Sequence, residues 1–486
     1  MQNHLKMILT KSSTLYYYPI SLYLFIYQYA NKSFYMKYLS TIIITFLFSI
    51  NGMTQVDTTK NIIDKTKIQI KLSDAKNKFY THNYPASINL YREVLAIQKN
   101  NPKANYGIAE CQFALNNFEK SKKYIEKSFQ SNPEVDPDVY YLMGNIYHRL
   151  GQLDQAEKSI LHFKNSIKEN KLIDYDVDLI LKQINYAKEA INKPVETTIK
   201  NMGDNINTKE AEYAPCISQD GKYMIFTSRR ADTKGGGIDV NFDHAYYSDI
   251  YLCEWNNDSK SWSEPQNTLG KVNTEYHDGG LGFTSDNSLL VYRNIMNVTR
   301  SGDIYVSQQG KSGSWATPKP IANKDKKISK KINSTYFESS ASITADGNYI
   351  YFVSERPGGS GQADIYYVKK NGKTYSEPEN IGININSASD EKCVFIHPSG
   401  KVLFFTSNGR DESIGSYDIY YCTGGHENWS EPVNIGYPIN TFLEEKTISV
   451  SSDGKTAYIG AYYDIESQGK ADLFKIDISF LNLPVE

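Results

Sequence analysis

The sequence has little of what marks a nucleic-acid-binding, metal-binding or disulfide-rich protein. Its 53 Lys and Arg nearly balance 55 Asp and Glu, so the formal net charge is only −2. A protein that binds nucleic acid or an anionic membrane surface usually carries an excess of basic residues. The five cysteines are scattered without C-x-x-C or another metal-type spacing. We therefore expect no nucleic-acid partner, no structural zinc and buried, unpaired cysteines.

Common catalytic motifs are also missing. The run Gly358–Gly361 contains one serine but is followed by Gln362, which breaks a G-x-S-x-G pattern. Lys311 follows a glycine, but the glycine that a phosphate-binding loop needs upstream is replaced by Tyr305. No H-E-x-x-H occurs, and the eight histidines show no pair at metal spacing. These absences predict that the chain is not an enzyme and holds no cofactor.

The N-terminus has the pattern of an export signal. Met36 opens a short basic region, and residues 39–50 form an apolar core of signal-peptide length. Small residues then precede Gln55, where we expect cleavage. The mature protein is predicted to have no membrane-spanning segment and to lie in the periplasm. Translation from Met1, which would make the first residues an N-terminal anchor, is the alternative.

A helical pattern with a long period follows the signal. Aromatic or leucine residues recur 34 and 35 residues apart, and small residues stand one turn later. This spacing resembles the tetratricopeptide repeat. The residues expected to pack the repeats are Tyr84, Phe118, Gly144, Tyr147, Leu153 and Ala156. A closing helix should follow Asn170. Such arrays present a concave groove to a peptide or protein, and the alternative is that the repeats brace the next domain.

A second repeat fills the rest of the chain. Five copies of a phrase occur, each with a turn between two strand-like runs and then D-I-Y or its equivalent; in the first four copies an aromatic-x-x-Pro element follows. Four short strands in about 54 residues are typical of a β-propeller blade. The residues that mark the third and fourth strands are Asp249, Asp303, Asp364, Asp418 and Asp472, with Trp262, Trp315, Tyr375 and Trp429.

The fifth copy lacks its fourth strand, and this predicts how the ring closes. The motif I-N-[ST] occurs five times but aromatic-x-x-Pro only four times. Residues 197–208 precede the first full unit and can supply the missing strand by pairing with residues 472–476. Closure leaves no open sheet edge. Five blades are expected, with a degenerate sixth as the alternative.

The blade sequences identify a family resemblance. Ala345-Asp346-Gly347, the run Phe352–Gly361 and Asp364-Ile365-Tyr366 resemble the TolB-like, WD40-like propeller repeat, and blade four repeats the pattern. Together with the tetratricopeptide repeats, the chain is similar to envelope proteins of Bacteroidetes-type bacteria. This resemblance implies an outer-membrane or secretion-associated role. Those proteins usually end in an OmpA-like domain, so peptidoglycan anchoring is not expected for a chain that stops after the last blade.

Two groups of residues are candidate binding sites. An acid stands eight residues before the turn of each blade, and equivalent positions in a propeller form a ring around the channel mouth. The five acids are Glu212, Asp278, Glu338, Glu391 and Glu445. They are predicted either to bind a cation or basic partner or to form a solvated rim. The rim would pair with Arg229, Arg293, Arg356 and Arg410.

An insertion in the first blade is the other candidate. Asp239, Asn241 and Asp243 alternate as oxygen ligands would in a calcium loop, but the glycine and distal glutamate of that loop are missing. The alternative is a contact loop for a partner. A basic run at residues 323–331 is expected to be a solvated loop.

Together these patterns predict an α+β multidomain protein, with an α-helical tetratricopeptide solenoid followed by an all-β propeller of four-stranded blades. The predicted division is a mis-called extension (1–35), the signal peptide (36–54), a linker (55–71), the repeats with their closing helix (72–192) and the propeller (195–486). The predicted function is a non-enzymatic scaffold that binds envelope proteins through the groove and the propeller face. Its alternative is a sensor that binds a solute, glycan fragment or cation in the propeller channel.

Overall fold

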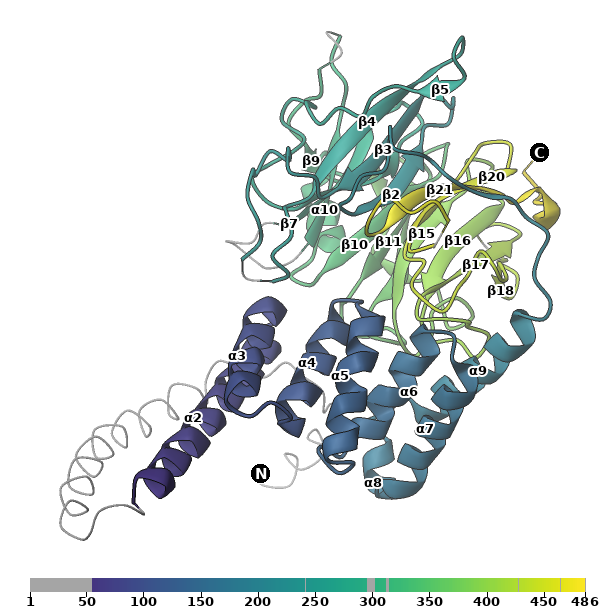
Figure 1. The fold of residues 1–486 in the computed structure, drawn as a ribbon. Helices are drawn as coiled ribbons and strands as arrows, with labels where there is room; N and C mark the ends of the chain where they lie inside the picture. Colours follow the sequence, from purple (N-terminus) through teal and green to yellow (C-terminus); the bar gives the residue numbers. More distant parts are fainter. Residues whose placement is uncertain are drawn as a thin grey trace, which may run out of the picture.

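The computed structural model describes residues 55–240, 242–294, 302–311, 314–426, 428–463 and 465–485. The predicted extension and signal peptide lie outside these residues. Figure 1 shows a row of helices alongside a ring of five sheets. The predicted fold class, a helical tetratricopeptide region followed by a five-bladed propeller, is confirmed.

The helices pair as tetratricopeptide repeats do. They are α2 (Gln55–Tyr80), α3 (Tyr84–Ile97), α4 (Pro102–Ala114), α5 (Phe118–Ser131), α6 (Val139–Arg149), α7 (Leu153–Ser166), α8 (Glu169–Leu172) and α9 (Val177–Ala190). Asn83 and Asn101 accept backbone N–H bonds at the starts of α3 and α4, where a proline occupies the first turn. The expected closing helix is α9. The segment 55–71 is not a linker, because it forms the first half of α2.

Small residues let the paired helices approach. Tyr84, Phe118 and Leu153 each open a second helix of a repeat and are buried. Gly144 of α6 faces Ile160 of α7 so closely that a β-carbon at this position would lie 2.5 Å from the Ile160 side chain. Ala156 is fully buried and Tyr147 partly buried in the same region.

Each blade is a four-stranded antiparallel sheet, with a split outer strand in blade three. Blade one has β2 (Glu212–Ile217), β3 (Tyr223–Ser228), β4 (Asp249–Asn256) and β5 (Ser261–Trp262); blade two has β6 (Asp278–Phe283), β7 (Leu289–Asn294), β8 (Gly302–Ser307) and β9 (Lys319–Pro320). Blade three has β10 (Glu338–Ile343), β11 (Tyr349–Ser354), β12 (Asp364–Asn371), β13 (Thr374–Tyr375) and β14 (Glu379–Asn380). Blade four has β15 (Glu391–Ile396), β16 (Val402–Ser407), β17 (Asp418–Thr423) and β18 (Val433–Asn434). Blade five has β19 (Ile448–Val450), β20 (Thr456–Ala461), β21 (Asp472–Asp477) and, from the start of the propeller, β1 (Ile199–Asn201).

The ring closes as the sequence predicted. β1 pairs antiparallel with β21, in the register Ile199 to Ile476. The first strand of the domain thereby completes the last blade, and both sheet edges are satisfied. Apolar side chains fill the space between neighbouring blades; Tyr351 and Ile365 of blade three, for example, share a buried cluster with Phe405 of blade four.

The asparagine of I-N-[ST] explains the fixed offset to D-I-Y. In blade three, the Asn386 side chain accepts from the backbone N–H of Ile365 (2.8 Å) and donates to its carbonyl oxygen (3.0 Å). Asn207, Asn273, Asn333 and Asn440 make the same pair of bonds to Leu473, Ile250, Ile304 and Ile419. Each asparagine therefore holds the connection that enters the next blade against the third strand of the blade before it.

The marker residues of the third and fourth strands lie inside the blades. Asp249, Asp364, Asp418 and Asp472 are buried at the starts of their strands, and Asp303 follows the first residue of β8. Trp262 packs edge-on against Trp255, and Trp315, Tyr375 and Trp429 contact the apolar clusters of blades one, three and four.

Three smaller features complete the fold. The basic run at 323–331 is not a solvated loop: it contains α10 (Lys326–Ile332), which buries Ile328 and Ile332. The five cysteines are buried and unpaired. Among the helices that the structure describes, none combines the length and the apolar character needed to cross a membrane.

The asparagine bonds give a stability prediction. Changing Asn386→Ala leaves the buried N–H of Ile365 without its acceptor, while the Ile365 carbonyl oxygen still accepts from the backbone N–H of Ile381. The unpaired N–H costs about 1–3 kcal/mol of the free energy of unfolding. Urea unfolding at neutral pH measures it. The matched change Asn371→Ala, at an exposed strand end, should cost less than about 0.5 kcal/mol. Equal effects of the two changes would contradict the role given to Asn386.

Candidate functional site

A buried carboxyl group stands where each blade begins. Glu212, Asp278, Glu338, Glu391 and Glu445 are each 0 or 1% exposed. At Glu338, the backbone N–H and hydroxyl of Ser334 donate to the two carboxyl oxygens (2.9 and 2.6 Å), and the Ser354 hydroxyl donates at 2.7 Å. Thr208 and Thr441 donate to Glu212 and Glu445 in the same way. The hydroxyl residue of I-N-[ST] is therefore the partner of the acid four residues later.

The structure differs from both interpretations of the five acids. They do not form a solvated rim, because burial removes them from water. At least one oxygen of each accepts from a donor of its own blade, so they are not free carboxylates. Burial is the main cause of their raised pKa values, which reach about 6 for Asp278, about 7 for Glu391 and about 8 for Glu445.

Arginines from the second strand or the turn after it lie beside the acids of the first three blades. Arg230 is 3.5 Å from Glu212, Arg293 is 3.5 Å from Asp278, and Arg356 is 3.3 Å from Glu338. The expected partner Arg229 instead binds the insertion of blade one. Opposite charge at this distance favours the ionised carboxylate.

Blade five has no arginine at this position. In blades one, three and four, the arginine also donates to the carbonyl oxygen of the isoleucine in I-N-[ST], as Arg356 does to Ile332 (2.9 Å). In blade five, Tyr463 donates to Ile439 instead. Tyrosine keeps the hydrogen bond but supplies no positive charge, so Glu445 lacks a cation from its own blade.

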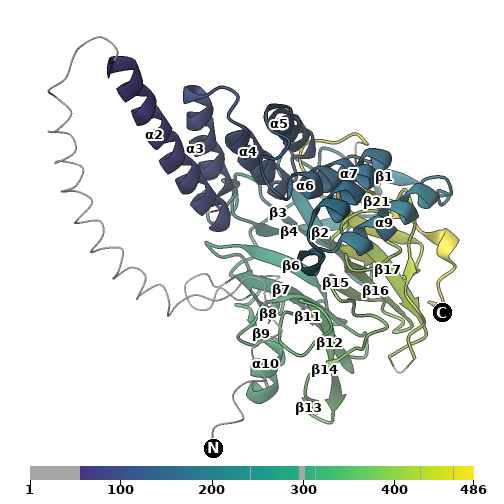
Figure 2. The same cartoon turned by 90° about the horizontal axis from the view of Figure 1, so that it is seen from below.

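The helical array lies against this part of the propeller. Asn83, Asn116 and Gly151, in the turns between paired helices, contact Val240, Glu444 and Phe442. Gly151 has φ +66°, and a β-carbon there would lie 2.7 Å from the Phe442 ring. Figures 1 and 2 show the row of helices along one side of the propeller.

The closing helix adds polar and apolar contacts to blade four. Gln183 of α9 donates to the carbonyl oxygens of Asn408 and Arg410 (both 3.0 Å), and Lys182 is 2.8 Å from Asp411. Ile414 is fully buried among side chains of α7 and α9. The array therefore braces the propeller, which was the alternative role expected for it.

The end of α6 brings two basic side chains into the interface. His148 is buried with its Nε2 2.9 Å from the Ile414 carbonyl oxygen, and burial lowers its pKa to about 3, so it is neutral. Burial also lowers the pKa of Arg149, whereas the nearby charges of Glu444, Asp418 and Glu445 raise it. Burial raises the pKa of Asp418 to about 6, and Arg149 opposes this rise. The array thus adds a positive charge near acids of blades four and five.

An acidic patch lies on the array itself. Burial and the charges of Asp136 and Asp138 raise the pKa of Glu110 to about 8, and Lys76 opposes this shift. The hydroxyl of Tyr175 donates to Asp138 (2.7 Å). We refer to Glu110, Asp136 and Asp138 as the acidic patch. A basic group of a partner would relieve the repulsion among these carboxyl groups.

The centre of the propeller leaves little room for a ligand. Residues from all five blades, among them Ile217, Phe395 and Val450, line a cavity of about 30 Å³ in the channel. A volume of this size holds roughly one water molecule. The channel therefore has no space for the solute or glycan fragment of the alternative prediction.

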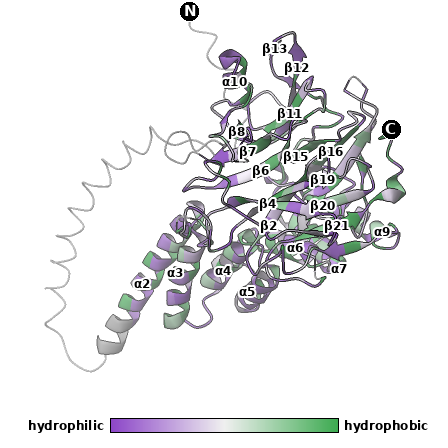
Figure 3. Ribbon diagram, turned by 90° about the horizontal axis from the view of Figure 1, so that it is seen from above, coloured by the Kyte–Doolittle hydropathy of each residue, from purple (hydrophilic) through white to green (hydrophobic). Residues whose placement is uncertain are grey.

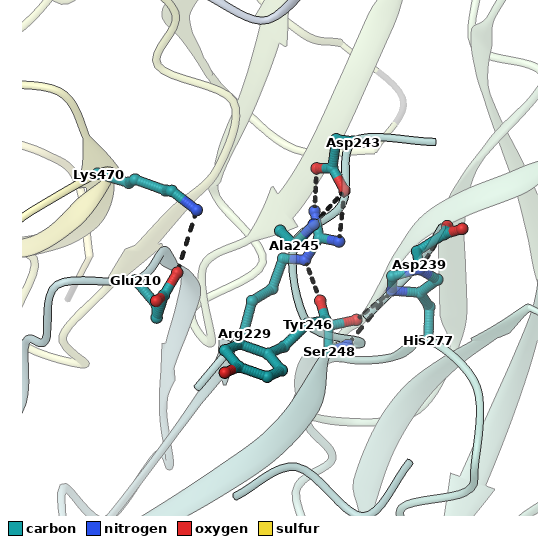
Figure 4. Close-up of polar contacts among 9 residues, drawn as sticks. All are labelled: Glu210, Arg229, Asp239, Asp243, Ala245, Tyr246, Ser248, His277 and Lys470. Atoms are coloured by element: carbon teal, nitrogen blue, oxygen red, sulfur yellow. Dashed lines mark hydrogen bonds and ion pairs between the residues drawn. The ribbon is translucent and has the colours of Figure 1, made fainter. Parts of the chain in front are cut away.

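The insertion of blade one is held by ion pairs. Arg229 binds both carboxylate oxygens of Asp243 (2.5 and 2.9 Å) and donates to the Tyr246 carbonyl oxygen, and Asp239 lies 3.5 Å from His277 (Figure 4). Asn241 lies outside the described residues. Because Asp243 is engaged by Arg229 and Asp239 faces His277, the two aspartates are not arranged as ligands of one calcium ion. Within the described chain, no group of three acidic, histidine or cysteine residues is placed to hold a metal.

The most informative interface residues were missed by the sequence analysis. Arg149 and His148 carry no motif, because their partners lie in another domain. A blade-by-blade alignment contains one usable signal, which is Tyr463 at the position of Arg230 and Arg356. A blade whose acid has no arginine beside it predicts that another part of the chain supplies a cation. The sequence does not indicate which residue does so.

Comparison with known proteins supports the tetratricopeptide half of the fold. Tetratricopeptide repeat models match residues 80–146 and 137–163, and no curated protein matches the chain. The Yersinia enterocolitica chaperone SycD, solved with a YopD peptide, is 15% identical (TM-score 0.23) and covers 25% of this chain and 93% of its own. Arabinofuranosidases from Podospora anserina, in complex with cellotriose, and Lactobacillus brevis are each 12% identical (TM-score 0.33). They cover 58% and 57% of this chain and 94% and 91% of their own.

The prediction that the chain is not an enzyme is wrong as an inference from its missing motifs. Glycoside hydrolases, including the arabinofuranosidases and a family-43 enzyme, are among the solved structures similar to the propeller. Such enzymes use a pair of carboxyl groups, which leaves no short motif in the sequence. At these identities the likeness shows the fold alone.

The carboxyl group of Glu445 predicts a pH dependence of stability. Its pKa is raised from 4.5 to about 8 in the folded protein, so the folded state binds the proton more tightly than the unfolded chain. This contribution is complete below about pH 4.5 and is lost as the pH rises to about 8. Glu445→Gln should therefore flatten the fall in unfolding free energy between pH 5 and 8, by up to about 1.4 kcal/mol per pH unit. Urea unfolding across this range tests it, with exposed Glu264→Gln as the control that should leave the slope unchanged.

Arg149 gives a second prediction. Arg149→Met removes a half-buried guanidinium that the charges of Glu444, Asp418 and Glu445 stabilise, and it should cost about 1–3 kcal/mol of unfolding free energy. Lys182→Met breaks only an exposed ion pair of the same interface and should cost about 0–1 kcal/mol. Urea unfolding of the whole chain compares them. Similar costs for both variants would show that Arg149 is not the charge partner of blade five.

Proposed function

We propose that this protein is a protein-interaction scaffold of the bacterial cell envelope, located in the periplasm and associated with outer-membrane or secretion components. The interface between the array and the propeller carries the proposal. An apolar cluster around Ile414 and several hydrogen bonds, among them those of buried His148 and of Gln183, hold the two domains in one orientation. Binding surfaces on the two domains therefore keep a fixed geometry, which is what a scaffold requires.

The array contacts the propeller through its helix turns, the end of α6 and the closing helix. The acidic patch is one binding surface of the array, and it binds a basic segment of a partner. The insertion of blade one is offered as another, because Val240 and Phe242 at its tip are half exposed while Arg229 fixes its base. Proteins with tetratricopeptide repeats commonly bind peptides or other proteins.

The envelope location rests on the predicted export signal and on the resemblance to TolB-like propeller proteins. Apolar residues 39–50, a basic start at Met36 and small residues before Gln55 support it. Fractionation of cells followed by N-terminal sequencing should find a chain that begins near Gln55 in the periplasm.

Affinity capture with crosslinking tests the scaffold. The mature chain should enrich a small set of envelope proteins, and Glu110→Lys should remove those bound through the acidic patch by placing a positive charge beside Asp136 and Asp138. Glu119→Lys, on the exposed side of α5, is the matched control and should capture the same set as the unchanged chain. If the unchanged chain captures no protein above the bare resin, the proposal fails.

A further inference from the structure

The outer face of α2 is unlike the corresponding faces of α4 and α6. Ala104 and Cys111 of α4 are buried in one cluster with α3, and Val139 and Ile146 of α6 are buried in one cluster with α5. Each of these helices therefore uses this face to pack on the helix before it. The repeat spacing places Ile70 and Asn77 of α2 at the same positions.

In α2 the side chains at these positions are exposed to solvent. Ile70 is 56% exposed, and Ile62, Ile63 and Tyr80 are 64%, 48% and 59% exposed. At 3.6 residues per turn, the four side chains fall within an arc of about 100° on one side of the helix. We call this set the α2 face. Figure 2 shows α2 as the outermost helix of the row, and Figure 3 shows hydrophobic residues along its length.

The α2 face is uncharged and is bordered by lysines. Thr66, Ser73 and Asn77 stand between its apolar residues. From Asn61 to Tyr80 the helix carries five lysines and two aspartates, and Lys65, Lys67 and Lys78 are exposed. The end of a solenoid normally has a polar capping face, whereas this one combines exposed isoleucines with a basic border.

We propose that the α2 face binds an amphipathic helix of a partner protein, apolar where it meets Ile62 and Ile70 and acidic on its flanks. The helix extends the solenoid by one layer, in the way that α3 packs on α4. This inference rests on the proposed scaffold function and names one of its surfaces and the kind of partner it takes.

The charge of the border favours this occupant over two others. A second copy of the chain would bring its own lysines to the contact, and like charges repel. A membrane surface requires a more continuous apolar stripe than isoleucines separated by Thr66, Ser73 and Asn77 provide. The same small polar side chains allow another helix to approach closely.

Peptide binding tests the inference. Two fluorescent synthetic helices of about 18 residues share one leucine stripe and differ only in flanking Glu or Lys. The mature full chain should bind the Glu peptide, and the Lys peptide at least about tenfold more weakly, in fluorescence anisotropy. Ile70→Lys should weaken binding of the Glu peptide at least about tenfold. The matched control Ile173→Lys, at a side chain 89% exposed beyond α8, should leave it unchanged.

Several results would overturn the inference. Equal binding of the two peptides, or no effect of Ile70→Lys, removes the α2 face as a helix site. Sedimentation that finds a dimer lost in Ile70→Lys assigns the face to a second copy. Binding to phosphatidylglycerol vesicles that is lost in the same variant assigns it to a membrane.

The scaffold itself is judged separately. If the unchanged chain and Ile70→Lys capture the same envelope proteins, the proposal for the α2 face is wrong, whereas the proposed scaffold function is retained. If the unchanged chain captures nothing, the scaffold fails whatever the peptides do.

Discussion

A buried carboxyl group needs donors or a cation around it, and this need organises every blade of the propeller. The acid at the start of each blade accepts from a hydroxyl residue four positions earlier and, in blades one, three and four, from a serine at the end of the second strand. In blade two, Arg293 lies 3.5 Å from Asp278. The asparagine beside the hydroxyl residue bonds to the previous blade. Three chain segments are thereby held at one point, and the repeated phrase of the sequence is the set of residues that makes these bonds.

Blade five holds its buried acid without an arginine of its own. Tyr463 replaces the arginine, and Arg149 of the helical array lies near Asp418, Glu444 and Glu445. The array therefore adds a positive charge near blades four and five, while Thr441 already donates to both carboxyl oxygens of Glu445. The docked turns and closing helix fix the orientation of the surfaces on which a scaffold function depends.

Because the channel is filled, the binding surfaces of the protein lie on its exterior rather than at the centre of the propeller. With about 30 Å³ available between the inner strands, ligands of ordinary size must bind elsewhere. The exposed features that remain lie on the array and the insertion of blade one: the α2 face, the acidic patch and the tip that carries Val240 and Phe242. Each is attached to a rigid base, since Arg229 anchors the insertion and packed helices support the other two.

The sequence by itself determined the fold, because hydrogen-bonding needs repeat with the blade and appear as fixed spacings. The positions of Asn207 and Asn386, the five D-I-Y strands and the missing fourth strand of the last unit led to five blades and to closure by residues 197–208. The linker at 55–71 and the loop at 323–331 were mistaken, since helices with scattered lysines have no clear apolar periodicity. Only the tertiary structure decided that the five acids are buried, that Asp243 belongs to Arg229 and that Arg149 lies near acids of blades four and five. Burial and charge pairing depend on which distant segments meet in space, and no local spacing records that.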